Sequence, residues 1–428
     1  MTDATATSRP VTNPLTSGTE READGAVELD LEARAVMRTG APRLDEPDVG
    51  SHTRAFHRRL PNYEVTPLRR CPALASSLGV GEIWVKDESR RLGLPAFKIL
   101  GTSYGVYRLL VQRAGEEPTW DTLDDLRRWA ANRLGPLTLC AATDGNHGRA
   151  VAHLAALLGF RATIYVPDNM SHARIESMQR EGAEIHSVDG DYDDAVRRAA
   201  EEASARCLVV SDTSWPGYTE VPTWVMDGYA TVFSEVREQL GAAPSDGRCS
   251  ETTLDLVVVP AGVGAFLGSA LRSLKGSDAV SPPAVVSVEP TTADCIARSL
   301  EAATLVHVPG PHRSIMVGLN CGTPSQVAWP RIARALDGAL CIGDGWAVRA
   351  MRDLAAAGIV AGETGAASLA GLTALCRSPA LSAAKAALGL GPRSRVLLVC
   401  TEGATDPGHY REIVGVSPEA GASPAAGT

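Results

Sequence analysis

Ala141-Ala142-Thr143-Asp144-Gly145-Asn146-His147-Gly148-Arg149-Ala150 is the stretch from which the fold is read. It follows an apolar run and precedes a stretch with helical periodicity, and its glycines permit a tight connection between the two. The free N–H groups of a helix start suit a carboxylate or phosphate. Asp144, Asn146 and His147 add an acid, an amide and an imidazole, whereas a simple helix cap needs only one such residue. The stretch predicts a strand, a ligand-binding loop and a helix.

The same order of strand and helix continues on both sides of this loop. Short apolar runs bounded by Gly, Pro or Asp predict strands at 82–86, 137–141, 162–166, 184–188, 207–211, 254–260, 285–288, 338–342 and 395–400. Helical stretches lie between them, at 101–113, 146–158, 173–180, 193–205, 223–239 and 266–274. Such alternation predicts an α/β protein with parallel twisted sheets flanked by helices. Because this is more strands than one sheet holds comfortably, we expect two lobes.

The ends of the chain have a different composition from its middle. Residues 1–48 carry ten acids and five arginines, and residues 417–428 are mostly Ala, Gly, Ser and Pro. Both segments predict disorder, because they offer little apolar surface to bury. The expected organisation is an acidic head at 1–48, a catalytic body at 49–416 and a tail at 417–428. A smaller lobe, at about 100–220, is expected to be inserted in a larger one.

Composition and charge narrow the class of protein. The chain has 428 residues, a net charge of −9, 44% hydrophobic and 21% charged residues, which is typical of a soluble globular protein. The acidic balance argues against nucleic acid as a partner. No apolar run reaches membrane-spanning length and the N-terminus does not resemble a signal peptide, so we expect no membrane partner and a cytoplasmic protein.

Metal and hydrolase motifs are missing from the sequence. The nine cysteines are scattered without a C-x-x-C pair, and the nine histidines form no H-E-x-x-H motif. We therefore expect reduced thiols and no metal site. A G-x-S-x-G motif is also lacking, which leaves a hydrolase triad unsupported.

Lysine is scarce, and one lysine stands out. Of 41 basic residues only four are lysines, at positions 86, 98, 275 and 385. Lys98 follows Phe97 where a loop enters a helix, and both the apolar neighbour and the helix start favour the free amine. A free amine can form an imine with an aldehyde, which a guanidinium cannot do. A surface lysine at a helix start is the alternative.

A third motif is a glycine-rich loop after a Val-rich strand, running from Val257 to Gly268. Its backbone amides and the following helix start predict a phosphate site. The spacing also resembles a dinucleotide fingerprint, and Glu289 ends the next strand, where an oxidoreductase would need an acid for a ribose. The loop by itself does not separate a nucleotide from a phosphorylated vitamin.

Two further predicted strands end in small and polar residues, at 400–406 and at 212–218. The carboxyl ends of parallel strands carry ligand groups. The turn at 361–367, which contains Glu363, enters a helix and is consistent with either a cap or a site.

Taken in order, these motifs resemble those of pyridoxal-phosphate enzymes of fold type II, the tryptophan synthase β type. Within that group the chain is most similar to the diaminopropionate ammonia-lyase family, over residues 56–412. The sharpest mark is Asp144, because serine and threonine dehydratases usually carry Ser at this position. The similar segments are 86–89, 94–101, 142–148, 212–224, 318–322, 362–366 and 401–406.

The resemblance implies how a pyridoxal 5'-phosphate cofactor would be held. Lys98 would carry it as a Schiff base, and Asn146 would hydrogen-bond its phenolic oxygen. The strand end at Cys400–Thr401 would face the pyridine nitrogen. Cys400 departs from the hydroxyl residue common in the family, and a thiol is a weak hydrogen-bonding group, so Thr401 is the alternative for this contact. The phosphate would be wrapped by Gly262, Val263, Gly264 and Ala265.

The resemblance also implies an α,β-elimination of 2,3-diaminopropionate to pyruvate and ammonia, catalysed by a homodimer acting on a small amino acid. Asp144 and Asp212 would be the acid–base groups, and they would serve opposite enantiomers if they lie on opposite faces of the cofactor. His147 and Tyr192 are candidates for secondary proton or orienting roles; for Tyr192 the alternative is a surface tyrosine.

Several alternatives stay open. A serine or threonine dehydratase, or another β-eliminating or β-replacing pyridoxal-phosphate enzyme of a specialised pathway, would share the fold. From other classes, a NAD-dependent oxidoreductase would use the Gly262 loop, and a cofactor-binding protein would lack catalysis.

Overall fold

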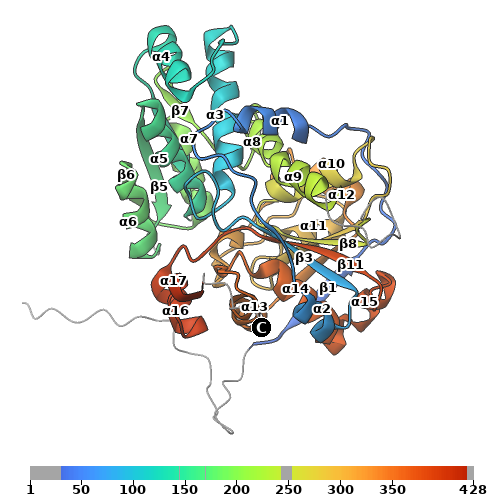
Figure 1. The fold of residues 1–428 in the computed structure, drawn as a ribbon. Coiled ribbons are helices and arrows are strands. Elements are labelled where there is room, and N and C mark those ends of the chain that lie inside the picture. Colours follow the sequence, from blue (N-terminus) through green and yellow to red (C-terminus); the bar gives the residue numbers. More distant parts are fainter. Residues whose placement is uncertain (1–29, 144, 169, 242–252, 422–428) are drawn as a thin grey trace, which may run out of the picture.

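The computed structural model describes residues 30–143, 145–168, 170–241 and 253–421. Within them the chain forms two parallel sheets flanked by helices, which confirms the predicted α/β class (Figure 1). All nine predicted strands are present, with ends shifted by at most two residues.

The larger sheet has seven strands. Its five central strands are parallel and its two edge strands are antiparallel to their neighbours. In spatial order they are β1 (Ala33–Met37), β10 (Gly338–Ile342), β9 (Ala284–Pro290), β8 (Leu256–Pro260), β11 (Arg395–Cys400), β3 (Glu82–Asp87) and β2 (Leu68–Arg70).

Helices cover both faces of this sheet, so its central strands are apolar at every position. In β8, Val257 and Val259 pack into one hydrophobic cluster, and Leu256 and Val258 pack into the other. The first cluster includes α9 (Ala230–Gly241), α10 (Ala265–Lys275), α11 (Cys295–Ala302) and α12 (Trp329–Ala335). The second includes α2 (Pro72–Leu78), α13 (Asp344–Ala356), α14 (Ala367–Arg377), α15 (Ser382–Ala387) and α16 (Pro407–Val414), with α17 (Pro418–Gly421) beside α16.

The smaller sheet has four parallel strands, in the order β6 (Glu184–Val188), β5 (Arg161–Pro167), β4 (Thr138–Ala142) and β7 (Cys207–Val209). It lies at the upper left of Figure 1, and its strands fall within the predicted smaller lobe, whose exact bounds stay a prediction. The helices around it are α3 (Lys98–Ala114), α4 (Leu123–Leu134), α5 (Asn146–Leu158), α6 (His172–Arg180) and α7 (Tyr192–Glu201).

Two further helices join the lobes: α8 (Glu220–Gly228) packs on α3 and α10, and α1 (Gly50–His57) packs on α9 and α8. The single helix expected at 223–239 is instead two, α8 and α9, because the first ends at Gly228. This glycine packs so closely on α3 that a Cβ there would lie 2.6 Å from the carbonyl oxygen of Leu100. Glycine is also a weak helix former, so the break costs little.

The predicted disorder of residues 1–48 is wrong for residues 30–48. β1 pairs with β10, the side chain of Leu44 is 3% exposed, and Arg34 forms an ion pair of 2.5 Å with Asp294. The segment has little apolar surface of its own, and it is ordered by a sheet edge built about 300 residues later. Residues 1–29 lie outside the described chain. At the other end, α17 occupies part of the predicted tail, and residues 422–428 are not described.

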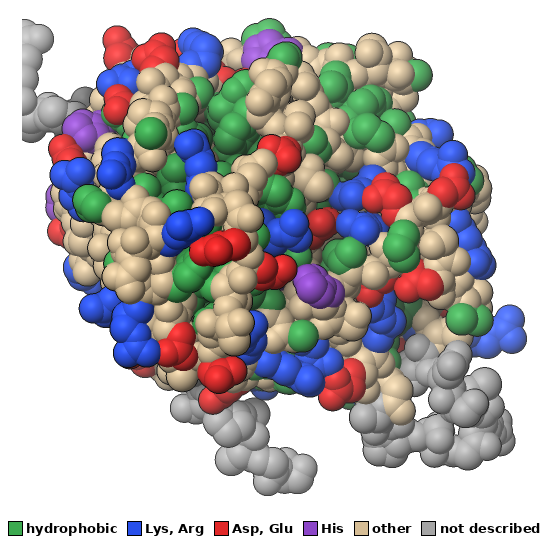
Figure 2. All heavy atoms as spheres, turned by 90° about the horizontal axis from the view of Figure 1, so that it is seen from above, with side chains coloured by type: hydrophobic (Ala, Val, Ile, Leu, Met, Phe, Trp, Pro, Cys, Tyr) green, Lys and Arg blue, Asp and Glu red, His purple; other side chains and the backbone are tan. Residues whose placement is uncertain are grey.

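The surface mixes both signs of charge. On the face shown in Figure 2, acidic and basic side chains are interspersed rather than gathered into one field. Within the described residues, the helices include none that is both long and apolar enough to cross a membrane.

Candidate active site

A cavity lies where the carboxyl ends of strands from both sheets come together, as expected for parallel α/β proteins. Its volume is about 840 Å³, including the open space at its mouth, which suits a small-molecule ligand. The smaller sheet contributes residues that follow β4 and β7, and the larger sheet contributes residues that follow β3, β8 and β11. The structure therefore brings four motifs that are far apart in sequence into one site.

Lys98 begins α3 and lines this cavity. Its Nζ lies 2.5 Å from Oδ2 of Asp212 and about 6 Å from the ring centres of Phe97 and Tyr229, at 5.7 and 6.0 Å. The amine is thus held between a carboxylate and two aromatic faces, with 22% of the side chain exposed. This is an enclosed but reachable amine, as Schiff-base chemistry requires.

The other three lysines have different surroundings. Lys86 is fully buried and bonded to Glu235 at 2.7 Å, and Lys275 is buried and bonded to Asp337 at 2.8 Å. Lys385 is half-buried at the end of α15. All four lysines are described by the structure, and Lys98 is the one that lines the cavity.

Asp212 follows β7 and is 4% exposed. Its Oδ1 accepts a hydrogen bond of 3.4 Å from the hydroxyl of Tyr192, which begins α7 and also lines the cavity. Burial by itself would raise the pKa of the Asp212 carboxyl, but the charge of Lys98 holds this pKa well below its usual range. Asp212 is therefore an ionised carboxylate at neutral pH.

His147 lies in the first turn of α5, and its ring is buried in the cavity wall. Burial lowers the pKa of the imidazole, and the charge of Lys98 lowers it further against the opposing effect of Asp212. Nε2 lies 2.8 Å from the carbonyl oxygen of Val210, which can only accept, so Nε2 carries the hydrogen of the neutral ring. Nδ1 is then an acceptor, and it has no partner among the described residues.

Asn146 is the first residue of α5 and lines the same wall. Its Nδ2 donates to Oε2 of Glu402, which follows β11, and Oε1 of Glu402 accepts from the backbone N–H of Thr364 at 3.2 Å. Burial raises the pKa of the Glu402 carboxyl to about 7.

The glycine-rich loop after β8 fits a phosphate. In the described parts of the chain, the backbone N–H groups of residues 262–265 donate to no acceptor, and they stand at the start of α10. Gly264 has φ of 88°, in the left-handed region, and a Cβ there would lie 2.6 Å from Ile332. This conformation is available to glycine and turns the amides toward the cavity. Gly262, Val263, Gly264 and Ala265 all line it.

At the end of β11 the structure distinguishes between the two residues proposed for the pyridine nitrogen. The side chain of Thr401 lines the cavity, and Cys400 is not among the lining residues. The thiol of Cys400 points back to the carbonyl oxygen of Glu402 at 3.3 Å, and burial raises its pKa well above the usual value. Alternation along the strand places these neighbours on opposite faces.

Several lining residues were not assigned a site role from sequence. Glu402 lies within the 401–406 segment, and an acidic residue close to the end of a buried strand is a pattern that could have indicated its role. Arg174 on α6 has no such signal, because an arginine on a short polar helix is common. It is 9% exposed, and the chain turns sharply at Gly145 beside it. Asp144 lies outside the described residues.

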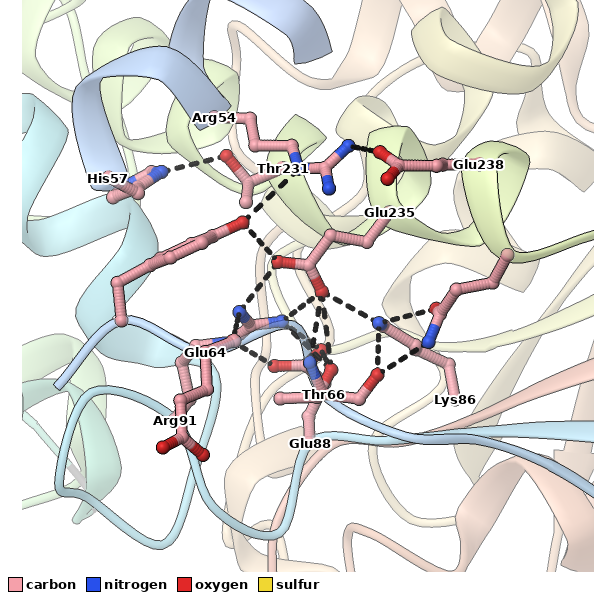
Figure 3. A network of polar contacts seen from close by, with 12 residues as sticks. Arg54, His57, Glu64, Thr66, Lys86, Glu88, Arg91, Thr231, Glu235 and Glu238 are labelled. Carbon is pink, nitrogen blue, oxygen red and sulfur yellow. Dashed lines mark hydrogen bonds and ion pairs between the residues drawn. The ribbon is translucent and has the colours of Figure 1, made fainter. Parts of the chain in front are cut away.

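The segment that leads to Lys98 is anchored by a buried ionic network, which we call the Glu235 cluster (Figure 3). It ties β3 and the segment after it to α9. Lys86 and Arg91 bind Glu235 at 2.7 and 2.8 Å, and Arg91 also binds Glu88 at 2.6 Å. The ionic side chains are fully buried, and Thr66 completes the network with a hydroxyl bond of 2.6 Å to Glu88. The cluster comprises Thr66, Lys86, Glu88, Arg91 and Glu235.

Glu289, the acid that a dinucleotide site would need, has another role. Its carboxylate accepts from the backbone N–H groups of Ile296 and Ala297, at 2.7 and 2.9 Å, in the first turn of α11. Glu289 is fully buried and is not among the residues that line the cavity. The geometry therefore gives no support to a ribose-binding role.

Three comparisons with known proteins show the family to which this chain belongs. Residues 60–402 match the family model described as "Pyridoxal-phosphate dependent enzyme". Diaminopropionate ammonia-lyase of Escherichia coli strain K12 is 38% identical over 373 residues, which cover 84% of this chain and 90% of that enzyme.

Solved structures of the Escherichia coli enzyme superpose well on this chain. Its complexes with D-serine and with an aminoacrylate-PLP azomethine reaction intermediate each match with a TM-score of 0.79 and 34% identity. Each match covers 90% of this chain and 97% of the other. The chain accordingly belongs to the diaminopropionate ammonia-lyase family of pyridoxal-phosphate dependent enzymes, and its cofactor is pyridoxal 5'-phosphate.

Proposed function

We propose that this protein converts 2,3-diaminopropionate and water to pyruvate and two molecules of ammonia by an α,β-elimination. The observation that carries the proposal is the pairing of Lys98 with the ionised Asp212 at 2.5 Å. The same cavity holds the amides of residues 262–265, which have no acceptor among the described residues. The amides of residues 262–265 can thus bind a phosphate, while Lys98 supplies an amine and Asp212 supplies a base.

The chain holds the cofactor at four places under this proposal. The amides of residues 262–265 would bind its phosphate, Lys98 would hold its aldehyde carbon, and Asn146 and Thr401 would bind the two polar positions of its ring. When bound, pyridoxal phosphate withdraws electrons from the substrate α-carbon and so makes the α-proton acidic.

Asp212 is a base suited to take an α-proton. Its carboxylate is ionised and buried from solvent, and it is oriented by contacts with Tyr192 and Lys98. The free amine of Lys98 would be the competing base. His147 is neutral before the reaction, and its Nδ1 can accept a hydrogen bond from the reacting groups while Nε2 stays bonded to Val210. Tyr192 orients Asp212 through its hydroxyl.

We favour a diamino acid as the substrate because the site has two candidate carboxylates, Asp144 and Asp212. The β-amino group leaves as neutral ammonia when it is protonated, so a site that holds it as the β-ammonium cation favours the elimination, and a carboxylate stabilises that cation. Asp144, which serine and threonine dehydratases usually replace by Ser, would meet this need beside Asp212. A hydroxyamino acid carries no β-cation for a second carboxylate to bind, and a dehydratase acting on it is the alternative that the assay must exclude.

Two finer proposals concern the state of the protein. We propose a homodimer located in the cytoplasm, on the basis of the family resemblance. Light scattering coupled to size-exclusion chromatography of the holoenzyme measures the first, and fractionation of producing cells measures the second.

The deciding experiment is a pyruvate-release assay with L- and D-diaminopropionate, L- and D-serine and L-threonine at equal concentrations. We expect kcat/KM for a diaminopropionate enantiomer to exceed that for either hydroxyamino acid by at least about tenfold. A larger value for serine or threonine would establish the dehydratase instead. Borohydride reduction followed by peptide mapping serves as a second measurement, with the pyridoxyl group expected on Lys98 and on none of the other lysines.

A further inference from the structure

Glu402 lies against a motif that the proposed reaction leaves without a role. The turn at residues 362–366, which precedes α14, wraps around it. The N–H of Gly362 donates to the carbonyl oxygen of Glu402 at 3.1 Å, and a Cβ on Gly365 would lie 2.2 Å from that same oxygen. Glycine is therefore required for this close approach. The turn and the segment after β11 form one unit that holds the Glu402 backbone.

The same unit is joined to the segment that carries Lys98. The N–H of Phe97 donates to the carbonyl oxygen of Thr401 at 3.3 Å, and the N–H of Gly403 donates to Pro95 at 2.9 Å. These two bonds place the backbone of Glu402 beside the segment that leads to Lys98. The side chain of Glu402 extends from there toward Asn146 on α5.

The carboxylate of Glu402 determines how the Asn146 amide is turned. An ionised carboxylate can only accept, so the Nδ2 group of Asn146 faces Glu402. The second hydrogen of Nδ2 and the Oδ1 atom are then left for other partners in the cavity. Rotating the amide by half a turn would place its oxygen against the carboxylate, which is unfavourable. Because Glu402 is 2% exposed, water does not replace it in this role.

We propose that Glu402 is a positioning residue, which acts through Asn146 to set how tightly the cavity binds the pyridoxal ring. This inference rests on the proposed contact between Asn146 and the cofactor. In this arrangement the Glu402 carboxylate fixes the orientation of the Asn146 amide, and its charge strengthens the proposed contact between Asn146 and the cofactor.

The charged groups around Glu402 make this link sensitive to pH. Burial raises the pKa of Glu402 to about 7, Arg174 on α6 opposes this rise, and Glu363 before α14 adds to it. Glu363 itself binds the ring of His409 on α16 at 2.5 Å. Below about pH 7 the Glu402 carboxyl is neutral and its bond with Asn146 loses its charge assistance. Cofactor binding should therefore weaken as the pH falls through this range.

The test is equilibrium dialysis of the holoenzyme against known concentrations of pyridoxal 5'-phosphate, from about pH 6 to about pH 8.5. It measures cofactor affinity and needs no turnover. The wild type is compared with Glu402→Gln, Asn146→Ala and the double variant. Glu402→Gln keeps an accepting oxygen but removes the charge, so we expect an affinity about tenfold lower at pH 8.5 and equal to the wild type at pH 6.

The double variant tests whether Glu402 acts through Asn146. We expect it to bind the cofactor no more weakly than Asn146→Ala alone, because the two residues form one interaction. Additive losses would overturn the inference, and so would a Glu402→Gln variant with the wild-type affinity and pH profile. If Asn146→Ala itself binds normally, both the proposed contact and the inference fail. If only the glutamine variant is normal, the contact stands and the inference fails.

Glu363→Gln is the matched control, since Glu363 is a nearby buried acid that does not line the cavity. Removing its charge should move the midpoint of the pH profile to lower pH and leave the affinity at pH 8.5 unchanged. If Glu402→Gln does not fold, Asn146→Ala decides: a pH profile that persists unchanged in that variant overturns the inference, and a flattened profile supports it.

Discussion

Glu235 and Glu402 are both buried glutamates with 2% exposure or less, yet their carboxyl groups are shifted in opposite directions. Burial opposes ionisation in both. For Glu235, the hydrogen bonds and charges of Arg91 and Lys86 outweigh it and lower the pKa to about 2. Glu402 is bonded by the neutral amide of Asn146 and the N–H of Thr364, and its pKa rises to about 7.

The difference shows what the two regions are built for. In the Glu235 cluster two cations and two carboxylates satisfy each other without water, which fixes β3 and α9 around the segment leading to Lys98. In the cavity, the donors and acceptors are fewer, and Nδ1 of His147 and the amides of residues 262–265 have no partners among the described residues. Unused hydrogen-bonding capacity in a buried place is costly unless a ligand takes it up.

The largest expected effect separates Lys98 from Lys86. Lys98→Ala should lower kcat/KM by at least about 10⁴-fold, since no other side chain can provide the reactive amine, while thermal stability changes little. Lys86→Met should do the reverse and destabilise the fold without moving the site of borohydride labelling. Steady-state kinetics and thermal melts of both variants make the comparison. A labelled Lys86, or full activity in Lys98→Ala, would refute the assignment.

The acids of the cavity come next. Asp212→Asn keeps the size of the side chain but removes the base, so turnover should fall by about 10²- to 10⁴-fold. Asp144→Asn is expected to cause a similar loss for at least one enantiomer, because the proposed reaction assigns it a second acid–base role. The measurement is kcat/KM for L- and D-diaminopropionate in each variant, with serine as the control substrate. If the acids serve opposite faces, the two variants should show different ratios between the enantiomers.

A near-wild-type rate for both enantiomers in Asp144→Asn would leave that residue as a helix cap. An asparagine caps a helix as well as an aspartate, so stability would then change by less than about 1 kcal/mol.

The third effect is on stability alone. Glu235→Gln leaves the buried Lys86 and Arg91 with an unbalanced charge, which should cost about 3–5 kcal/mol in the free energy of unfolding. Activity per folded molecule should stay close to that of the wild type, because the cluster does not line the cavity. Denaturant unfolding and active-site titration give the two values. A variant that is stable but inactive would show that the Glu235 cluster takes part in catalysis.

The smallest effect is a contrast in pH dependence. The pKa of Glu235 is lowered in the folded protein, so its contribution to stability is present above about pH 4.5 and is lost as the pH falls toward about 2. The pKa of Glu402 is raised, so stability is instead lost as the pH rises from about 4.5 to about 7. The free energy of unfolding of Glu402→Gln, measured relative to that of the wild type, should therefore be higher at pH 8 than at pH 5 by about 1–3 kcal/mol.

Unfolding midpoints of the two proteins at both pH values, at equal cofactor occupancy, measure this change. If the stability difference between them is the same at pH 5 and pH 8, Glu402 does not titrate between these values.

Local pattern was sufficient for much of the architecture. Val-rich runs such as 256–260 were recognised because strands covered on both faces must be apolar throughout, and the 146–158 helix because it follows a strand end with a polar, glycine-containing loop. β1 and β2 escaped notice. β1 is an edge strand whose partner, β10, lies about 300 residues later, and β2 is an edge strand of only three residues beside β3, so the residues of each carry little signal.

The candidate site divides in the same way. Lys98, Asn146 and the Gly262 loop were identified from sequence, because imine formation and phosphate binding each need particular residue types at particular places in the chain. The partners of these residues were not. Nothing near Arg174 in the sequence relates it to the cavity, and nothing near Glu402 relates it to Asn146, 256 positions away.

The sequence by itself determined the chemistry available to this protein. A scarce lysine, a glycine-rich loop and a polar strand end each indicate a kind of chemistry even when the tertiary structure is unknown. Tertiary structure decided the ionisation of the groups that use that chemistry. The pKa of a buried carboxyl depends on which donors are brought to it, and those donors come from other elements. Two glutamates of one chain thus became an ion-paired structural anchor and an acid that titrates near neutral pH.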